Sequence, residues 1–384
     1  MKKPYIKIGL FFLLPVALVV GCSHEDTSVP DPERVAVQIS GVLSQKSATT
    51  KGVPWDGRVD PINPVNHLGL PPVQLDVGIV TVNYETEDPS NPDGGQPDIE
   101  AWSTTTADWT RGYFGSISVG DVVGGVILTD NTPPTNGEIS YTNEDGTLIQ
   151  KTFYDDYGEH YFLRVVYPFH HGTNGEYAAE LVQTPGRGAG VVFSGLDGSQ
   201  DILCSNLGWG NIYQPLIETE AGAGNLVLSH MLTMFRVFVK AGDDTAITQY
   251  GNVTEDENGN PGLRLTDQPA SVRFDMIDLE ANPGSDLTHY YASEFPDNPV
   301  VLDNTSGTYI GYMMALPAQK FRVEVFTAER AWIHGEFSFA TDSNPYRISE
   351  AGKIYDITLN LVEAYEIQIK VSTPKEWWMN STFD

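Results

Sequence analysis

The sequence has few cations for its length. Its 384 residues include 22 lysines and arginines against 51 aspartates and glutamates, which gives a formal net charge of -29. Nucleic-acid binding depends largely on basic contacts to phosphate, so this balance opposes binding to nucleic acid, and no nucleic-acid partner is expected. It also opposes adsorption on anionic lipid, whereas it favours solubility at a cell surface.

Cysteine is also scarce, and the two cysteines, Cys22 and Cys204, are expected to be used differently. Residues 1–21 carry lysines near the start and then an apolar run too short to span a membrane comfortably, which is typical of a signal peptide. Val19-Val20-Gly21-Cys22 resembles a lipobox, at which the signal is removed and Cys22 is acylated, as with palmitate. The alternative is an ordinary secretory signal followed by a chance cysteine. Acylation leaves Cys204 alone, so no intrachain disulfide is expected.

Motifs of enzymes and cofactor sites are missing as well. No glycine-rich phosphate loop ending in Lys-Ser or Lys-Thr occurs in the sequence. The segment Val192-Phe193-Ser194-Gly195 lacks the first glycine of a hydrolase nucleophile elbow. We therefore expect no enzymatic activity, no catalytic residue and no cofactor.

A few polar clusters are weaker candidates for chemistry. His170-His171 has neither a nearby cysteine nor helical spacing and is better explained as a surface pair than as a metal site. His230 lies in an apolar strand and is expected to be a hydrogen-bonded core or edge histidine. Residues 256–260 resemble a calcium loop, but Pro261 stands where the sharp-turn glycine belongs. The acidic pair Asp155-Asp156 would serve glycoside hydrolysis only across a sugar-binding cleft. We expect no metal site.

Alternating apolar and polar residues dominate the rest of the chain, and no long stretch shows an amphipathic helical period. Glycine (37 residues) and proline (25 residues) are frequent and punctuate the alternating segments. One face of each segment is expected to be buried, so the pattern predicts an all-β fold of sandwich type. The clearest segments are 35–39, 75–79, 161–167, 321–325, 355–361 and 365–371.

The length of the chain suffices for two domains. The acidic, glycine-containing segment 218–224 precedes an apolar strand at 225–240 and is the candidate boundary. It predicts domains at 52–220 and 221–384. Because the strand at 225–240 could complete either sheet, the boundary stays open by about ten to twenty residues.

The order of these features resembles the fimbrillins, the lipoprotein subunits of type V pili. The lipobox, a first strand, a basic site, two sandwich domains and a final strand followed by tryptophan occur in that order. The resemblance covers most of the chain and implies two tandem, transthyretin-like β-sandwich domains. The motifs that carry it are Tyr167-Pro168-Phe169, Gln200-Asp201-Ile202-Leu203, Leu228-Ser229-His230-Met231-Leu232 with 235–239, 352–359 and Trp377.

The resemblance implies a structural pilus subunit that is exported as a lipoprotein, activated by proteolysis and polymerised by strand exchange for cell adhesion. It places the protein at the cell outer membrane, through the lipid on Cys22, and in the pilus (fimbrium). The expected partners are other pilin subunits and an Arg- or Lys-specific protease, and a host protein or glycan is a further candidate. Tip and anchor subunits share this layout, so those roles remain alternatives.

A second alternative is a monomeric surface lipoprotein that binds glycans. Exposed aromatic side chains stack on sugar rings, although packing in a core is the more common use of such residues. The aromatic cluster that would serve this purpose consists of Trp102, Trp109, Tyr113 and Phe114. The two readings differ at the N-terminus, because only the pilus role requires the first strand to be cut away.

Removal of the first strand, at 35–43, would expose backbone groups and an apolar groove that a strand from a neighbour can fill. Residues 22–51 would then be a lipidated propeptide. Lys51 follows a small polar run and is the first candidate for cleavage, ahead of Lys46 and Arg58. The alternative interpretation is that Lys51 is a lysine in an ordinary linker and is not cleaved.

The candidate donor strand lies at the other end of the chain. Residues 364–371 alternate well, and the two tryptophans at 377 and 378 add large apolar side chains for pockets in a groove. Head-to-tail insertion into the next subunit would not close and would give a filament. The alternative is that this strand completes its own C-terminal sheet. The predicted donor residues are Tyr365, Ile367, Ile369, Val371, Trp377 and Trp378.

Overall fold

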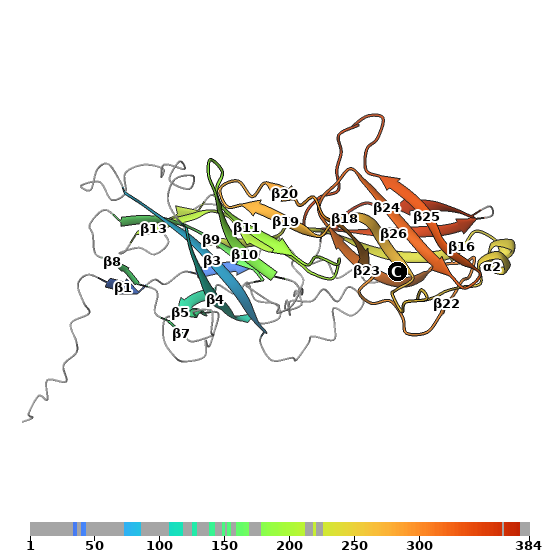
Figure 1. Ribbon diagram of the computed structural model, residues 1–384, viewed down its shortest axis with the longest axis horizontal. Coiled ribbons are helices and arrows are strands. Elements are labelled where there is room, and N and C mark those ends of the chain that lie inside the picture. Colours follow the sequence, from blue (N-terminus) through green and yellow to red (C-terminus); the bar gives the residue numbers. More distant parts are fainter. Residues whose placement is uncertain are drawn as a thin grey trace, which may run out of the picture.

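The structure is a computed structural model that describes residues 34–36, 40–43, 73–85, 107–117, 125–128, 138–142, 148–149, 152–154, 159–168, 178–211, 218–219, 226–362 and 365–376. Strands make up most of these residues, and they include one helix, α2 (Asp244–Tyr250). Figure 1 shows the strands in two groups along the long axis of the molecule, with a small sheet between them. No helix within the described ranges is long and apolar enough to cross a membrane. The all-β prediction is confirmed.

An eleven-stranded sheet, which we call the N-terminal sheet, forms the first group. Its middle strands, β3 (Val73–Glu85) and β9 (Glu159–Tyr167), pair antiparallel. Residues 77 and 79–82 of β3 and residues 162–166 of β9 are buried. Both faces of these strands are therefore covered, whereas the alternation at 161–167 predicted one buried face. The order of strands is β12 (Leu203–Ser205), β15 (Leu226–His230), β2 (Ser40–Leu43), β5 (Gly125–Leu128), β6 (Glu138–Thr142), β4 (Asp108–Ile117), β3 (Val73–Glu85), β9 (Glu159–Tyr167), β13 (Gly208–Asn211) and β14 (Glu218–Thr219), with β7 (Leu148–Ile149) beside β6.

A four-stranded sheet, which we call the shared sheet, contains strands from both halves of the sequence. The hairpin of β10 (Ala178–Thr184) and β11 (Gly188–Ser194) comes from the first half. It pairs through β11 with β19 (Ser271–Asp275), and β19 pairs with β20 (Ala281–Pro283). All these pairings are antiparallel, so two hairpins that are distant in sequence form one continuous sheet.

The shared sheet buries an apolar face built from both hairpins. Val191 and Phe193 of β11 and Val272 and Phe274 of β19 are all buried. The rings of Phe193 and Phe274 meet edge to face with their centroids 5.9 Å apart. The first half of the chain therefore has part of its core supplied by residues of the second half.

Arg164 of β9 fastens the N-terminal sheet to the shared sheet. The residue is 1 % exposed, and its guanidinium donates hydrogen bonds to the backbone oxygens of Met276 and Ile277, which directly follow β19. A further N–H of the same group donates to the backbone oxygen of Ser205 at 2.6 Å. Backbone carbonyls of both sheets are thus satisfied by one buried side chain.

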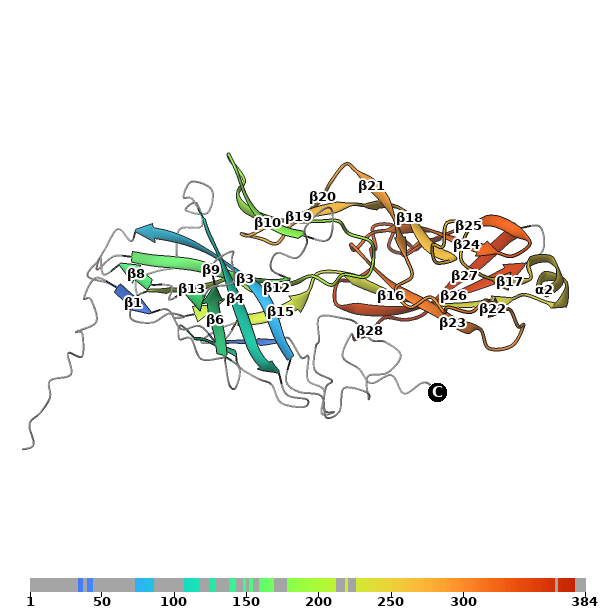
Figure 2. The same ribbon diagram turned by 60° about the horizontal axis from the view of Figure 1, so that its bottom comes forward.

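Two more sheets pack face to face in the second group and together form what we call the C-terminal sandwich (Figure 2). The ring of Phe235, in the first of them, lies 4.7 Å from that of Phe321 and 5.5 Å from that of Phe337, both in the second. The first, the β16 sheet, has the order β23 (Thr308–Ala315), β16 (Thr233–Ala241), β26 (Lys353–Val362) and β27 (Glu366–Val371), with β28 (Lys375–Glu376) also paired to β26. The second, the β24 sheet, has the order β21 (Leu287–Tyr291), β18 (Leu263–Pro269), β24 (Lys320–Thr327), β17 (Asn252–Val253) and β22 (Val300–Val301), with β25 (Arg330–Ser338) beside β24.

The chain passes between the two groups at Met231 and Leu232, further along than the predicted boundary at 220. The segment predicted as one strand at 225–240 is divided there into β15, in the N-terminal sheet, and β16, in the C-terminal sandwich. Met231 N donates to Ile202 O at 2.8 Å on one side, and Gly352 N donates to Leu232 O at 2.9 Å on the other. These opposed backbone bonds end one strand and begin the next.

Candidate functional site

The predicted first strand, 35–43, is present as two short strands with different partners. β1 (Arg34–Ala36) pairs antiparallel with β8 (Thr152–Tyr154) in a separate two-stranded sheet. β2 lies inside the N-terminal sheet, between β15 on one side and β5 on the other. The second of these strands therefore occupies an interior position in the order of strands.

β2 is held by a parallel ladder and an antiparallel ladder. Gly41, Val42 and Leu43 stand opposite residues 226–228 of β15, and Ser40 and Gly41 stand opposite residues 126 and 125 of β5. Without β2, backbone groups of both neighbouring strands would lose their partners and would face one slot, which we call the first-strand slot. Leu226 and Leu228 of β15 are buried and give this wall of the slot apolar side chains.

The predicted lipidation and cleavage residues lie outside the described residues. They are Cys22, Lys46, Lys51 and Arg58. Their positions in the chain are still informative, because all three basic candidates follow the end of β2 at Leu43 and precede the beginning of β3 at Val73. A cut at any of them would detach both β1 and β2 from the rest of the chain.

A buried Asp–His pair lies at the far end of β15. His230 Nδ1 and Asp201 Oδ2 share a hydrogen bond of 2.6 Å, and their side chains are 5 % and 0 % exposed. Burial raises the pKa of the Asp201 carboxyl, and the nearby His230 opposes this shift only in part. The prediction that His230 is a hydrogen-bonded core histidine is confirmed. Two motifs that carry the family resemblance, 200–203 and 228–232, thus meet in one contact.

The predicted donor strand is β27, and in this structure it completes its own sheet. Six residue pairs join it to β26, from Val362↔Glu366 to Ile357↔Val371. Ile367 and Ile369 pack on the core above Gly335 of β25, where an added Cβ would come within 3.1 Å and 2.9 Å of their atoms. The conformation described here is therefore the alternative of an own-sheet strand, and a donor role remains a prediction that requires β27 to detach.

Two further features bear on the predicted donor. Tyr365 lies just before β27 at a positive φ of 67°, and its backbone N–H donates to the hydroxyl of buried Tyr250 at 3.0 Å. That hydroxyl in turn donates to Val362 O, so Tyr250 of α2 is hydrogen-bonded both to the end of β26 and to the residue before β27. Trp377 and Trp378 lie outside the described residues.

The remaining polar candidates of the sequence have separate places. His170-His171, the acidic pair 155–156 and Trp102 lie outside the described residues, whereas Trp109, Tyr113 and Phe114 belong to β4. The Asp256 carboxylate accepts hydrogen bonds from Asn258 N and Asn260 N, both at 2.9 Å, and from the Asn260 side chain at 3.0 Å. Its oxygens thus organise the turn that contains them.

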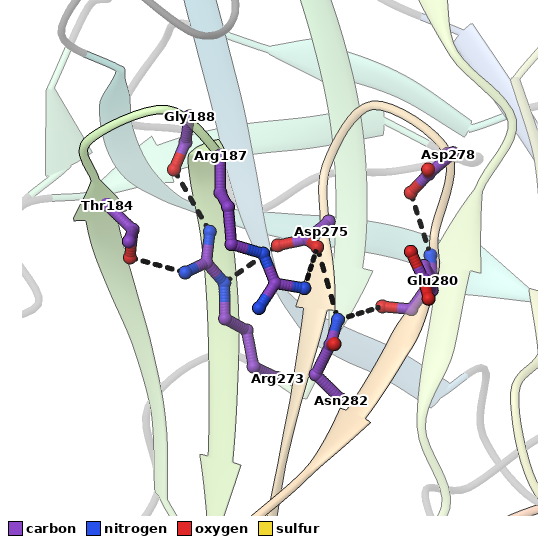
Figure 3. A network of polar contacts seen from close by, with 8 residues as sticks. All are labelled: Thr184, Arg187, Gly188, Arg273, Asp275, Asp278, Glu280 and Asn282. Carbon is purple, nitrogen blue, oxygen red and sulfur yellow. Dashed lines mark hydrogen bonds and ion pairs between the residues drawn. The ribbon is translucent and has the colours of Figure 1, made fainter.

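An acidic group at the end of the shared sheet was not predicted. Carboxylate oxygens of Asp275, Asp278 and Glu280 lie within 4.8 Å of one another. Figure 3 shows that Asp275 faces two arginines, with Arg187 2.7 Å and Arg273 2.8 Å from its carboxylate oxygens. The two arginines neutralise the negative charge of the Asp275 carboxylate, which a metal ion would need for binding. We therefore interpret the acidic group as a structural contact that holds the β19–β20 hairpin.

A polar groove of about 580 Å³ lies on the β24 sheet and was also missed from the sequence. The alternation of Phe321, Val323 and Val325 with Arg322 and Glu324 places the two charged residues on the polar face of this strand. The other residues of the groove come from three further strands, and the pairing of those strands cannot be predicted from the local sequence. Arg322 donates to Asp267 at 2.9 Å, and Arg264 donates to Glu324 at 2.6 Å. The charged and imidazole side chains that line the groove are Asp267, His289, Arg322, Glu324, His334 and Glu336.

No family model and no curated protein match the chain. Solved structures resemble it at low identity. A proposed cell adhesion protein from Bacteroides uniformis is 13% identical with a TM-score of 0.42, over 91% of this chain and 99% of that chain. A fimbrial protein from Bacteroides vulgatus is 12% identical with a TM-score of 0.39, over 85% and 100% of the two chains. The tip fimbrial protein Mfa3 from Porphyromonas gingivalis, with a C-terminal truncation, is 8% identical with a TM-score of 0.39, over 90% and 100%.

Proposed function

We propose that the chain is a non-enzymatic structural subunit of a pilus that is exported as a lipoprotein, loses its first strands by proteolysis and polymerises by strand exchange. The observation that carries the proposal is the position of β2, whose loss would leave β15 and β5 facing one slot. Strand addition to such exposed edges gives affinity through main-chain hydrogen bonds. Fimbrial roles are also named for two of the similar structures, but the proposal rests on this order of strands.

The order of residues along the chain supports processing after β2. Cleavage at Lys46, Lys51 or Arg58 removes β1 and β2 together with the lipid on Cys22 and leaves β3 and all later strands joined. Cleavage at Arg34 would release the lipid but keep β2 in place. The subunit would thus be tethered at the outer membrane before processing and held in the pilus by its neighbours afterwards.

The C-terminal end is the proposed donor, and its two strands differ in how firmly they are held. β28 pairs with β26 at only two positions, Lys353↔Glu376 and Ile354↔Lys375, whereas β27 pairs at six. Release of β28 therefore breaks fewer backbone pairings than release of β27, and the segment that begins at β28 continues to both tryptophans. A chain truncated at Thr373 should fold and fail to polymerise; undiminished polymerisation would refute the donor assignment.

The test of the proposal is the state of the N-terminus on cells. Surface-extracted protein is analysed by intact mass and N-terminal sequencing, with Lys51→Ala and Lys46→Ala chains as matched controls. We expect a mature chain that begins after one of the basic candidates and that migrates as a ladder of polymers. A chain that still begins at acylated Cys22 and migrates only as a monomer would overturn the proposal.

A second candidate function is glycan binding, and the groove on the β24 sheet favours it. Its planar carboxylate, guanidinium and imidazole groups suit hydrogen bonds to sugar hydroxyls, and its volume of about 580 Å³ falls in the range of small-molecule sites. Glycan-array binding of the intact chain is compared with that of Arg322→Ala and of the exposed control Lys370→Ala. Binding lost in the first variant alone would support this function, and binding unchanged in both would exclude the groove.

A further inference from the structure

β15 is one wall of the first-strand slot, and its two ends are held by different partners. Residues 226–228 pair with β2, and residues 228–230 pair with β12. Leu228 is the one position that belongs to both ladders. When β2 is removed, only the second end of β15 keeps a backbone partner in the sheet.

The polar contacts of β15 gather at this second end. His230 shares the buried 2.6 Å hydrogen bond with Asp201, which lies two residues before β12. Met231 N donates to Ile202 O at 2.8 Å. On the other side, Gly352 N donates to Leu232 O at 2.9 Å, so the same point is tied to the C-terminal sandwich.

Apolar burial alone does not fix the register of such a short wall. Burial of Leu226 and Leu228 opposes a shift by one residue, which would move every side chain of β15 to the opposite face, but a shift by two residues keeps the same face inward. The Asp201–His230 bond is directional, and breaking it leaves polar atoms unpaired in the interior. This bond therefore opposes any shift of β15 relative to β12. Neither Asp201 nor His230 takes part in the ladder between β15 and β2, so the bond is kept when β2 is removed.

We infer that Asp201 and His230 are positioning residues of the first-strand slot, which hold β15 in register after β1 and β2 have gone, so that an incoming strand meets a preformed edge. This inference rests on the proposed function, in which the slot is emptied and refilled. The pair acts through β15 and does not touch the incoming strand at the positions that β2 now occupies. Its effect should thus appear in the cut protein far more than in the uncut one.

The experiment uses the exported chain with Cys22→Ser, to prevent acylation, and a specific protease site placed at Lys51. After cutting, the N-terminal fragment is removed in mild urea, and a labelled synthetic peptide of residues 34–45 is titrated into the cut protein. Asp201→Ala removes the bond, Asp201→Asn keeps a hydrogen-bonding side chain, and Asp356→Asn is the control. Asp356 forms a similar pair with buried Arg236, at 2.5 Å, in the C-terminal sandwich.

We expect Asp201→Ala to weaken peptide binding by roughly ten- to a hundredfold. Asp201→Asn should recover most of the affinity, and Asp356→Asn should stay within about twofold of the wild type. Equal affinity of the Asp201→Ala and wild-type proteins would overturn the inference. If the wild-type cut protein binds no peptide, the slot itself is refuted, and with it the proposed function.

Hydrogen exchange on the cut wild-type protein tests independently whether β15 stays in register. This test does not depend on whether the Asp201→Ala variant folds. Among residues 226–228, the amides that bond to β2 should lose protection when the fragment is removed, and among residues 228–230 the amides that bond to β12 should keep it. Loss of protection over the whole of β15 would overturn the inference, because the wall would then not be held. Peptide binding by the wild type would still support the slot in that case.

Discussion

Replacement of Arg164 by methionine tests whether the two halves of the chain are held together as one body. The guanidinium bonds three backbone oxygens, of Ser205, Met276 and Ile277, and the residue is 1 % exposed. Each oxygen left without a donor costs about 1–3 kcal/mol, and removal of a desolvated charge offsets part of the sum. We expect the free energy of unfolding to fall by about 3–5 kcal/mol.

The assay is urea unfolding of the Cys22→Ser chain, combined with hydrogen exchange at β19 and β20. Those strands should lose protection in Arg164→Met, because the turn that follows β19 is no longer fixed to the N-terminal sheet. Arg322→Ala is the matched control: its side chain is 64 % exposed, and its loss should change stability by less than about 1 kcal/mol. A loss below about 1 kcal/mol for Arg164→Met, with normal protection of β19, would refute the reasoning.

Three further predictions concern other parts of the chain. Gly335→Ala places a Cβ 2.9 Å from Ile369 and 3.1 Å from Ile367, so it should destabilise the chain by about 1–3 kcal/mol and raise hydrogen exchange in β27. Burial raises the pKa of the Cys204 thiol from 9.0 to about 12, so that thiol should resist alkylation at pH 8 until the chain unfolds. Because the unfolded thiol ionises first, stability should also fall between about pH 9 and pH 12, and less so in Cys204→Ala. Lys51→Ala should shift processing to Lys46 or Arg58 if Lys51 is the natural site, as intact mass would show.

Local alternation was a sound guide to single strands. The segments 355–361 and 365–371 alternate without interruption, and they are found in β26 and in Tyr365 with β27. Each has one face against a core and the other toward polar surroundings, as the pattern requires. The same reasoning placed Arg322 and Glu324 on the polar face of β24, where they line the groove.

The pairing of strands that are distant in the chain could not be predicted from the sequence. Nothing near β11 indicates that Gly190 stands opposite Asp275, because a ladder depends on both partners and on the layers above them. Arg164 illustrates the consequence: an arginine among alternating apolar residues reads as a solvent-facing position, and it is buried because the shared sheet covers that face. The division of 225–240 at Met231 is likewise set by backbone bonds to residues 202 and 352.

The shared sheet also explains how the proposed subunit could lose strands without losing its fold. The first half keeps the buried side chains of Val191, Phe193, Val272 and Phe274 and the hydrogen bonds of Arg164 to Met276 and Ile277, and none of these residues belongs to the segment removed by cleavage. Removal of β2 would therefore open one position in the N-terminal sheet, where backbone groups of β15 and β5 would face the slot. Since the second half of the chain supplies β19 and β20, the proposed function implies that the first half would be complete for strand exchange only after both halves have folded. Folding of the C-terminal half would thus precede assembly, which orders the two events without any additional component.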